Sequence, residues 1–313
     1  MRYLLSLVAL VASLVADVHA DMFILPPSDV DVVGQVQTIT ASSAETLLDI
    51  ARRYDIGQNE IVLANPEVDR WLPDDGSRVI LPNRYILPDA DRSGLVLNLP
   101  EMRLYYYPKS KTGEIPVVIT HPISVGRMDW ETPLGLTQIV SKQKDPEWRP
   151  PKSIKEEHAT EGETLPDVIR AGPDNPLGRY AMRLGIPGYL IHSTNKPYGV
   201  GMRVTHGCIR MYPEDIELIF DEIPVGTPVR IVNQPIKLGW LAGSLFIELH
   251  PPLEEDEEKY ADYMQSVLNS IADFLAANDD EPDINAGRTI HLSGRALRQA
   301  VSERNGIPVM ITR

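Results

Sequence analysis

The feature of this sequence that most restricts its fold is a series of short strand-like segments between residues 94 and 234. The segments have strand-like composition and are separated by turn-forming residues. The segments lie at 95–99, 103–107, 117–125, 136–141, 177–184, 189–192, 205–211 and 229–232. One helical pattern, at 214–220, follows Pro213 and has acidic residues in its first turn. The sequence therefore predicts a mostly β unit with little helix.

The first two segments are joined by Pro100 and Glu101, which predicts a β-hairpin. The second of them contains three consecutive tyrosines, at 105–107. Successive side chains of a strand point to opposite faces of its sheet. We therefore expect at least one of the three tyrosines to be exposed.

The chain is strongly acidic and long enough for two or three compact units. Its 313 residues carry a formal net charge of −14, which is unchanged without residues 1–20 because Arg2 and Asp17 cancel. Such a surface lacks the basic face that nucleic-acid phosphates or anionic lipid headgroups require. The composition therefore excludes a nucleic-acid partner and electrostatic docking to a membrane.

Residues 1–20 have the composition of a cleavable secretory signal. Arg2 precedes an apolar segment at 3–16, and Val18-His19-Ala20 places small residues where a signal peptidase reads, so cleavage is predicted before Asp21. The alternative is a membrane anchor, but the segment is shorter than the roughly 20 residues that cross a bilayer. No other segment is long and apolar enough to span a membrane, so we expect an exported protein without a membrane span in its mature chain.

Residues 37–83 have the pattern of a small β-α-α-β domain. Strand-like segments at 37–40 and 78–81 enclose two short helices, the first capped by Ser43 and the second at 56–64. The preceding residues, 21–36, are expected to form a lead-in segment or an edge strand.

Three segments of this domain, LLDIARRY, ANP and VILP, resemble the LysM module. The resemblance implies binding of glycans that contain N-acetylglucosamine. Ser-Ala-Glu-Thr at 43–46 replaces the family's usual Gly-Asp-Thr. The alternative is a small helix-strand domain that only packs against its neighbour.

Residues 235–313 have both strand and helix patterns, which predicts an α/β subdomain. A hairpin at 237–250 turns at Ala242 and Gly243. An amphipathic helix at 260–275, a second helix at 296–303 and a strand at 308–312 follow it.

Cys208 is the only cysteine, and it lies near the end of YLIHSTNKPYGVGMRVTHGCIRM, residues 189–211. A lone Cys in an exported protein has no internal disulfide partner, so a nucleophilic thiol is the leading interpretation. Its proton requires a base, and the two candidates are His206 on the same segment and His192 on another strand. An adjacent strand brings a side chain across from the nucleophile, so we expect His192 to be the base.

Gly207 directly precedes Cys208, where a positive φ or the close approach of a substrate is accommodated. We expect the N–H groups of Gly207 and Cys208 to form an oxyanion hole, and Ser193 or a backbone carbonyl to orient His192. A zinc site is the rival interpretation, but structural zinc takes four ligands from paired Cys and His motifs. No metal or other cofactor is expected.

A proline-rich stretch at 145–176 has little regular pattern apart from a short helical signal at 153–158. A connection this long inside a compact domain is usually a functional loop. We expect a flap beside the active site, with Trp148 as a platform for a sugar or peptide. An ordered surface connection is the alternative.

The motif around Cys208 resembles that of the YkuD-type L,D-transpeptidases. Their signature is a His-Ser pair followed by Ser/Thr-His-Gly-Cys, an aliphatic residue and Arg or Asn, and this chain has His192-Ser193 and then THGCIR at 205–210. TPLG at 132–135 and GPDNPLG at 172–178 extend the likeness over about 94–234. The resemblance implies that Cys208 is the nucleophile, His192 the base, Ser193 the residue that orients it, and His206 a supporting residue.

The resemblance also implies a β-sandwich-like catalytic domain at 94–234, in a chain that is α+β overall. Arg210 matches the family's Arg variant and can hold a substrate carboxylate through a bidentate pair. Tyr189 and Thr205 are expected to contact substrate with it.

The implied activity is that of a periplasmic peptidoglycan L,D-transpeptidase. Cys208 would attack the bond between diaminopimelate and D-Ala in a tetrapeptide stem, and an amine of another stem or a Lys of an outer-membrane lipoprotein would resolve the thioester. The expected partners are therefore stem peptides, glycan and a lipoprotein. The alternatives are an L,D-carboxypeptidase or amidase that uses water, and an inactive cell-wall-binding protein.

Overall fold

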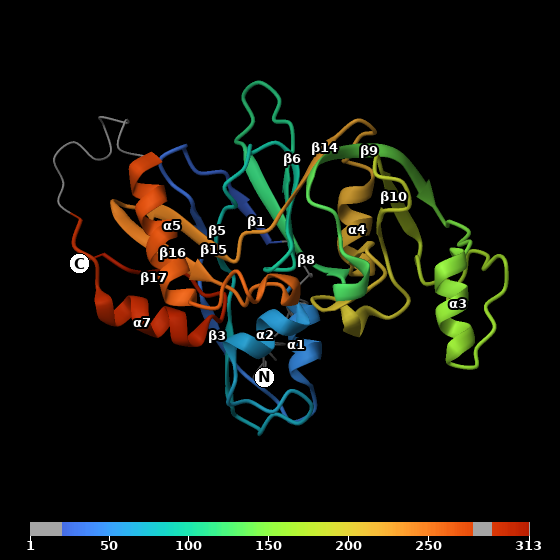
Figure 1. Ribbon diagram of the computed structural model, residues 1–313, viewed down its shortest axis with the longest axis horizontal. Coiled ribbons are helices and arrows are strands. Elements are labelled where there is room, and N and C mark those ends of the chain that lie inside the picture. The colour runs from blue at the N-terminus through green and yellow to red at the C-terminus, as the bar shows by residue number, and fades with distance from the viewer. Residues whose placement is uncertain (1–20, 278–289, 313) are drawn as a thin grey trace, which may run out of the picture.

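The computed structural model describes residues 21–277 and 290–312, so the predicted secretory signal lies outside the described residues. A central β unit has a small helical unit beneath it and a C-terminal subdomain at its side (Figure 1). Within the described ranges, every helix is too short or too polar to cross a bilayer.

The central unit is a ten-stranded sheet that closes on itself. Its strands are β1 (Asp21–Ile24), β6 (Gly94–Asn98), β7 (Arg103–Tyr107), β8 (Val117–Gly126), β9 (Gly135–Lys144), β10 (Tyr180–Leu184), β11 (Leu190–His192), β12 (Arg203–Thr205), β13 (Ile209–Met211) and β14 (Pro228–Val232). They pair in the order β1-β8-β13-β11-β10-β9-β14-β6-β7, with β12 also on β8 and a further β8–β7 pairing. Two sheet layers share β8 and β9, so the sandwich-like prediction is confirmed and the layers are joined into a barrel.

Each strand segment predicted between 94 and 234 overlaps at least one of these strands, because each places apolar side chains in one common core. The segment predicted at 205–211 is not one strand, since β12 ends at Thr205, β13 begins at Ile209 and a turn lies between them. The core includes Leu97, Ile123, Ile139, Met182 and Ile209, all fully buried. Helix α4 (Pro213–Phe220) begins at the predicted Pro and closes one side of this core with its buried apolar face.

The prediction of an exposed tyrosine on β7 is wrong. Tyr105, Tyr106 and Tyr107 are 0%, 5% and 4% exposed. Tyr106 points into the barrel core, whereas Tyr105 and Tyr107 point to the outer face and pack in a second apolar cluster with Val33 and Tyr85. The outer face of β7 is therefore covered by the segments that precede the barrel, which alternation along one strand cannot reveal.

The β-α-α-β unit has the predicted order. Strand β3 (Gln37–Thr40) pairs antiparallel with β4 (Arg78–Leu81), and helices α1 (Leu47–Arg53) and α2 (Gln58–Ala64) lie between them in the chain. Next to this unit, β2 (Val32–Gly34) pairs with β5 (Arg84–Ile86).

The predicted helix cap at Ser43 is wrong. Helix α1 is capped by Thr46, whose Oγ1 accepts from the Asp49 N–H at 3.1 Å. The Asp49 carboxylate in turn accepts from the Thr46 N–H at 2.9 Å. This reciprocal capping box satisfies two helix-end donors, and a cap at Ser43 would not form it.

In the part of the chain that the structure describes, the C-terminal subdomain packs two helices on a three-stranded sheet. Its elements are β15 (Ile236–Leu241), β16 (Ser244–Leu249), α5 (Tyr263–Ala277), α7 (Gly294–Glu303) and β17 (Val309–Met310). The hairpin turns at Ala242 and Gly243 as predicted, with φ of 50° and 75°, which is the left-handed geometry of a type I′ turn.

A buried arginine fixes the helical unit to the barrel. Arg103 on β7 is fully buried, and its Nη2 donates to Glu60 of α2 at 2.7 Å and to the Asp55 carbonyl at 3.1 Å. Nη1 donates to Thr120 at 3.3 Å, and the guanidinium lies 4.3 Å from the centre of the Tyr85 ring. The charge of Arg103 is thus satisfied only when both units are in place.

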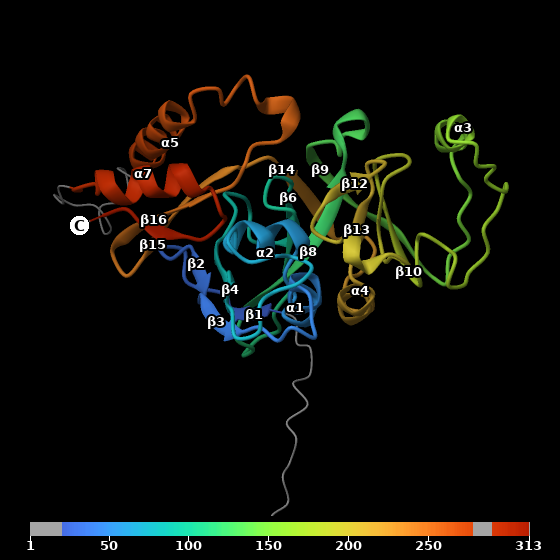
Figure 2. The same ribbon diagram turned by 90° about the horizontal axis from the view of Figure 1, so that it is seen from below.

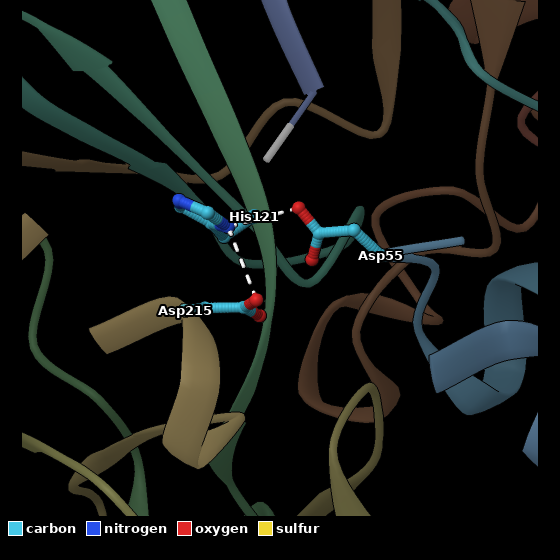
Figure 3. A group of neighbouring side chains, drawn as sticks. All are labelled: Asp55, His121 and Asp215. Atoms are coloured by element: carbon cyan, nitrogen blue, oxygen red, sulfur yellow. Dashed lines mark hydrogen bonds and ion pairs between the residues drawn. The ribbon is translucent and has the colours of Figure 1, made fainter. Parts of the chain in front are cut away.

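A second buried group crosses the same junction (Figure 3). His121 on β8 has its Nδ1 2.9 Å from Asp55, which follows α1, and 3.6 Å from Asp215 of α4. Burial, and after it the neighbouring Asp55 carboxylate, raise the pKa of Asp215 well above its ordinary value, which favours the protonated carboxyl that can donate to Asp55. His121 Nδ1 thus meets a carboxylate from each of two other segments, while Asp55 Oδ1, His121 Nε2 and Asp215 Oδ2 are buried without a hydrogen-bond partner among the described residues. The group is a contact between units.

A third buried group joins the C-terminal subdomain to the barrel. Lys237 Nζ lies 2.8 Å from both Glu101 and Glu248, and it donates to the Ile86 carbonyl at 2.7 Å. His250 Nε2 is 2.7 Å from Glu248. The Lys237 ammonium lies between the two carboxylates and supplies the positive charge that balances them.

Arg103→Met should destabilise the mature protein by about 3–5 kcal/mol, because it leaves Glu60 buried without its partner. The matched control is Arg53→Met, which removes a pair with Glu45 from an arginine that is 44% exposed and should cost under about 1 kcal/mol. Urea unfolding measures both. Equal losses in the two variants would contradict the assignment of Arg103 as the fixed contact between units.

Candidate active site

Parallel pairing of two short strands brings the predicted residues to one face of the barrel. Strand β11 pairs with β13 so that Ile191 lies opposite Ile209 and His192 opposite Arg210. Side chains alternate along a strand, so Cys208, two residues before Arg210, lies on the same face as His192 and Arg210. The pairing thus places a thiol, an imidazole and a guanidinium together.

The His192 ring is buried and held in one orientation. Its Nδ1 lies 2.5 Å from the Ser193 carbonyl oxygen, so Nδ1 carries the hydrogen and Nε2 is left to accept a proton. Ser193 therefore orients the ring through its backbone carbonyl. Burial, together with the charge of Arg210, lowers the pKa of His192 to about 3, which makes the imidazole neutral throughout the physiological range.

Cys208 is a thiol in the resting protein. Its Sγ donates to the Gly188 carbonyl oxygen at 3.6 Å. Burial raises the pKa of the thiol, and this effect exceeds the opposing effects of the Leu190 backbone and of Arg210 and Arg183. The pair is thus neutral thiol and neutral imidazole, and the proton must leave as the sulfur attacks.

The turn before the nucleophile is rigidly supported. Gly207 has φ of +91°, and a Cβ there would lie 2.7 Å from the Tyr189 ring. The Thr132 hydroxyl donates to the Gly207 carbonyl at 2.9 Å, and the Thr205 hydroxyl donates to the Cys208 carbonyl at 2.6 Å. Because C=O and N–H of a peptide are trans, the Thr132 contact also fixes the direction of the Cys208 N–H.

The stretch 145–176 forms a projecting flap with helix α3 (Lys152–Thr160) at its outer end (Figures 1 and 2). The buried Asn175 ties its base, donating through Nδ2 to the Pro146 carbonyl at 2.7 Å and the Ile169 carbonyl at 3.3 Å. Trp148 lies in the same base, where its backbone pairs with Ile169 at 2.8 Å in both directions. The short helical signal in this stretch is confirmed.

The flap contacts the active site through Glu157, a residue that the sequence analysis missed. Glu157 Oε2 lies 2.6 Å from His206 Nε2, and its other oxygen pairs with Arg127. The Trp130 ring packs edge-on against His206, with ring centres 5.1 Å apart. The hydrogen bond from Arg127, with that from His206, holds the pKa of Glu157 below its ordinary value, so the carboxylate is ionised.

A second glycine permits the packing behind His192. A Cβ on Gly178, which has φ of +62°, would lie 2.7 Å from both Cβ and Oγ of Ser193. Gly178 ends the GPDNPLG motif, whose Asn175 ties the flap. One motif therefore serves both the flap and the residue that orients the base.

Known proteins are similar in sequence to this chain. Residues 92–231 match the model of the L,D-transpeptidase catalytic domain. The probable L,D-transpeptidase ErfK/SrfK of Escherichia coli strain K12 is 39% identical to this chain, over 92% of this chain and 90% of that protein. The chain belongs to the L,D-transpeptidase family. The probable L,D-transpeptidases YbiS and YcfS of the same strain are 37% and 34% identical, over 92% and 97% of this chain and 90% and 92% of their own.

Family membership confirms the predicted enzyme class, an L,D-transpeptidase. The similarity to these L,D-transpeptidases extends well beyond residues 92–231 and so includes parts of the units on either side of the catalytic domain.

The rate of Cys208 alkylation by iodoacetamide should increase with pH. The midpoint of the curve of rate against pH should lie above pH 8.5, about the pKa of a free Cys, because burial raises the pKa of the thiol. His192 should add no midpoint between pH 5 and 8, since its pKa lies near 3. Mass spectrometry across a pH series measures the rate. A plateau already reached below pH 7 would instead indicate a resting thiolate paired with an imidazolium.

Gly207→Ala should lower the transfer rate by about 100-fold, because the added methyl group displaces the turn that carries Cys208. Gly113→Ala is the matched control, since Gly113 has nearly the same φ, +90°, but no atom near the added Cβ. Initial rates of both purified variants test this. If both variants lost a similar fraction of the transfer rate, backbone strain alone would explain the effect of Gly207→Ala.

Proposed function

We propose that Cys208 catalyses acyl transfer at the bond between diaminopimelate and the terminal D-Ala of a tetrapeptide stem. The Cys208 sulfur attacks the carbonyl carbon while His192 takes the thiol proton. His192 then gives that proton to the leaving nitrogen, D-Ala departs and a thioester remains. The observation that carries this proposal is the parallel register that sets His192 beside Arg210 and on the face of Cys208.

The surrounding residues support the reaction by position and charge. The N–H groups of Gly207 and Cys208 stabilise the negative oxygen of the tetrahedral intermediate, an effect typically worth about 3 kcal/mol for each donor. Arg210, whose Nε is buried without a partner among the described residues, binds a carboxylate of the stem. Tyr189 and Thr205 shape the turn that faces the substrate.

Trp148 in the flap and the unit at 37–83 are the two proposed contacts with substrate outside the site itself. Trp148 is half-buried at the base of the flap and offers an aromatic surface to a sugar or peptide. The β-α-α-β unit at 37–83 acts as a LysM-like module that holds the enzyme on glycan and raises the effective concentration of stems. Residues 94–234 then perform the chemistry, and 235–313 form the C-terminal subdomain.

The thioester is resolved by an amine, supplied by diaminopimelate of another stem or by a Lys of an outer-membrane lipoprotein. These substrates lie outside the cytoplasm, which agrees with the secretory signal proposed at 1–20 and with a periplasmic location.

Incubation of the mature protein with a disaccharide tetrapeptide tests this proposal. The expected results are release of D-Ala, an acyl-enzyme of the expected mass, and a cross-linked dimer, all abolished in Cys208→Ala. Tripeptide without dimer, even with added amines, would indicate a carboxypeptidase that uses water. An unmodified native protein that still binds peptidoglycan would indicate an inactive wall-binding protein.

A further inference from the structure

The two histidines of the site have different surroundings. The His192 residue is 4% exposed and its ring is held by a backbone carbonyl. The His206 side chain is 25% exposed and meets the ionised carboxylate of Glu157, itself 27% exposed, at 2.6 Å. A molecule arriving from solvent can therefore reach His206 more readily than His192.

The proposed reaction needs more than one base. An acceptor amine of the Lys type has a pKa of about 10.4, so roughly one molecule in a few thousand is uncharged at pH 7. The ammonium must lose one proton before its nitrogen can attack, and a second as the amide forms. After D-Ala leaves, His192 has returned its proton and can accept only one.

His192 is also poorly placed for the first of these protons. It lies opposite Arg210, whose guanidinium repels an ammonium, and its lowered pKa makes it a weak base. The surroundings of His206 differ, because the Glu157 carboxylate 2.6 Å from its Nε2 attracts an ammonium instead of repelling it. Arg127 holds the second oxygen of Glu157 and keeps the carboxylate in place.

We propose that His206, oriented by Glu157, removes the first proton from the acceptor ammonium, and that Glu157 is a positioning residue for the transfer step. This inference rests on the proposed function and concerns its second half only. The contact between Nε2 and the carboxylate places the hydrogen on Nε2, so Nδ1 of His206 is the accepting atom.

The protons and bonds of the transfer step then balance. The first ammonium proton moves to His206 Nδ1 and later to solvent. The freed nitrogen lone pair forms the C–N bond, the C–S bond breaks, and the second proton returns through His192 to the Cys208 sulfur. No oxidant, metal or further reactant is required.

Glu157→Gln tests the assignment because glutamine keeps the shape of the side chain but not its charge. Acyl-enzyme formation from the disaccharide tetrapeptide should stay within about 2-fold of the native rate. Transfer to an Nα-acetyl-lysine acceptor should fall about 10-fold to 100-fold, the range of general-base catalysis. Transfer to hydroxylamine, which is already uncharged at pH 7, should change by less than about 3-fold.

Glu156→Gln is the matched control, because Glu156 is exposed on the same helix and pairs with Lys152 at 3.3 Å. It should behave as the native protein with both acceptors. His206→Gln should reproduce the selective loss of transfer to the lysine acceptor, which gives a second variant should Glu157→Gln disturb the flap.

Equal losses with both acceptors would overturn the proposal, since they would mean that Glu157 only supports the structure. Unchanged transfer to the lysine acceptor in either variant would also overturn it. A native protein that forms no acyl-enzyme overturns the proposed function itself, and this result is seen before any variant is compared.

Discussion

The pairing of β8 on both of its edges holds the rest of the structure in place. This strand pairs with β1, β7, β12 and β13, and so closes the barrel and carries the strand that follows Cys208. Its middle residue His121 contacts the helical unit, and its last residue, Gly126, donates its N–H to Thr132 at 3.0 Å beside the Gly207 turn. Because buried backbone groups must be paired, the register of β8 sets the position of all of these neighbours.

The two histidines of the site differ in burial and in the charged groups near them. Burial keeps His192 and Cys208 neutral, so the resting enzyme holds no charged nucleophile that would react without substrate. His206 lies at the edge of the site with Glu157, Arg127 and Trp130 around it. The site thus combines a buried, neutral His192 with a more exposed His206 that contacts an ionised carboxylate.

The order of strands along the chain and the hairpin turns were largely predictable because they depend on neighbours in the chain. The hairpin turn lies at Ala242 and Gly243, as the sequence predicted. The cap of α1 was misplaced by three residues, from Ser43 to Thr46, since a capping box depends on which pair is spaced correctly. The burial of Tyr105 to Tyr107 could not be predicted, because it depends on segments packed against the outer face of β7.

The sequence by itself determined which reactive groups are present: a lone Cys208, the His192-Ser193 pair and THGCIR predict an acyl-transfer nucleophile and its base. Only the tertiary structure decided how these groups are charged, since the pKa of a group depends on burial and on charges from distant segments. It also decided that Glu157, 49 residues from His206 in the chain, is its partner. Local patterns specify which groups are present, whereas contacts between distant segments decide which of them meet.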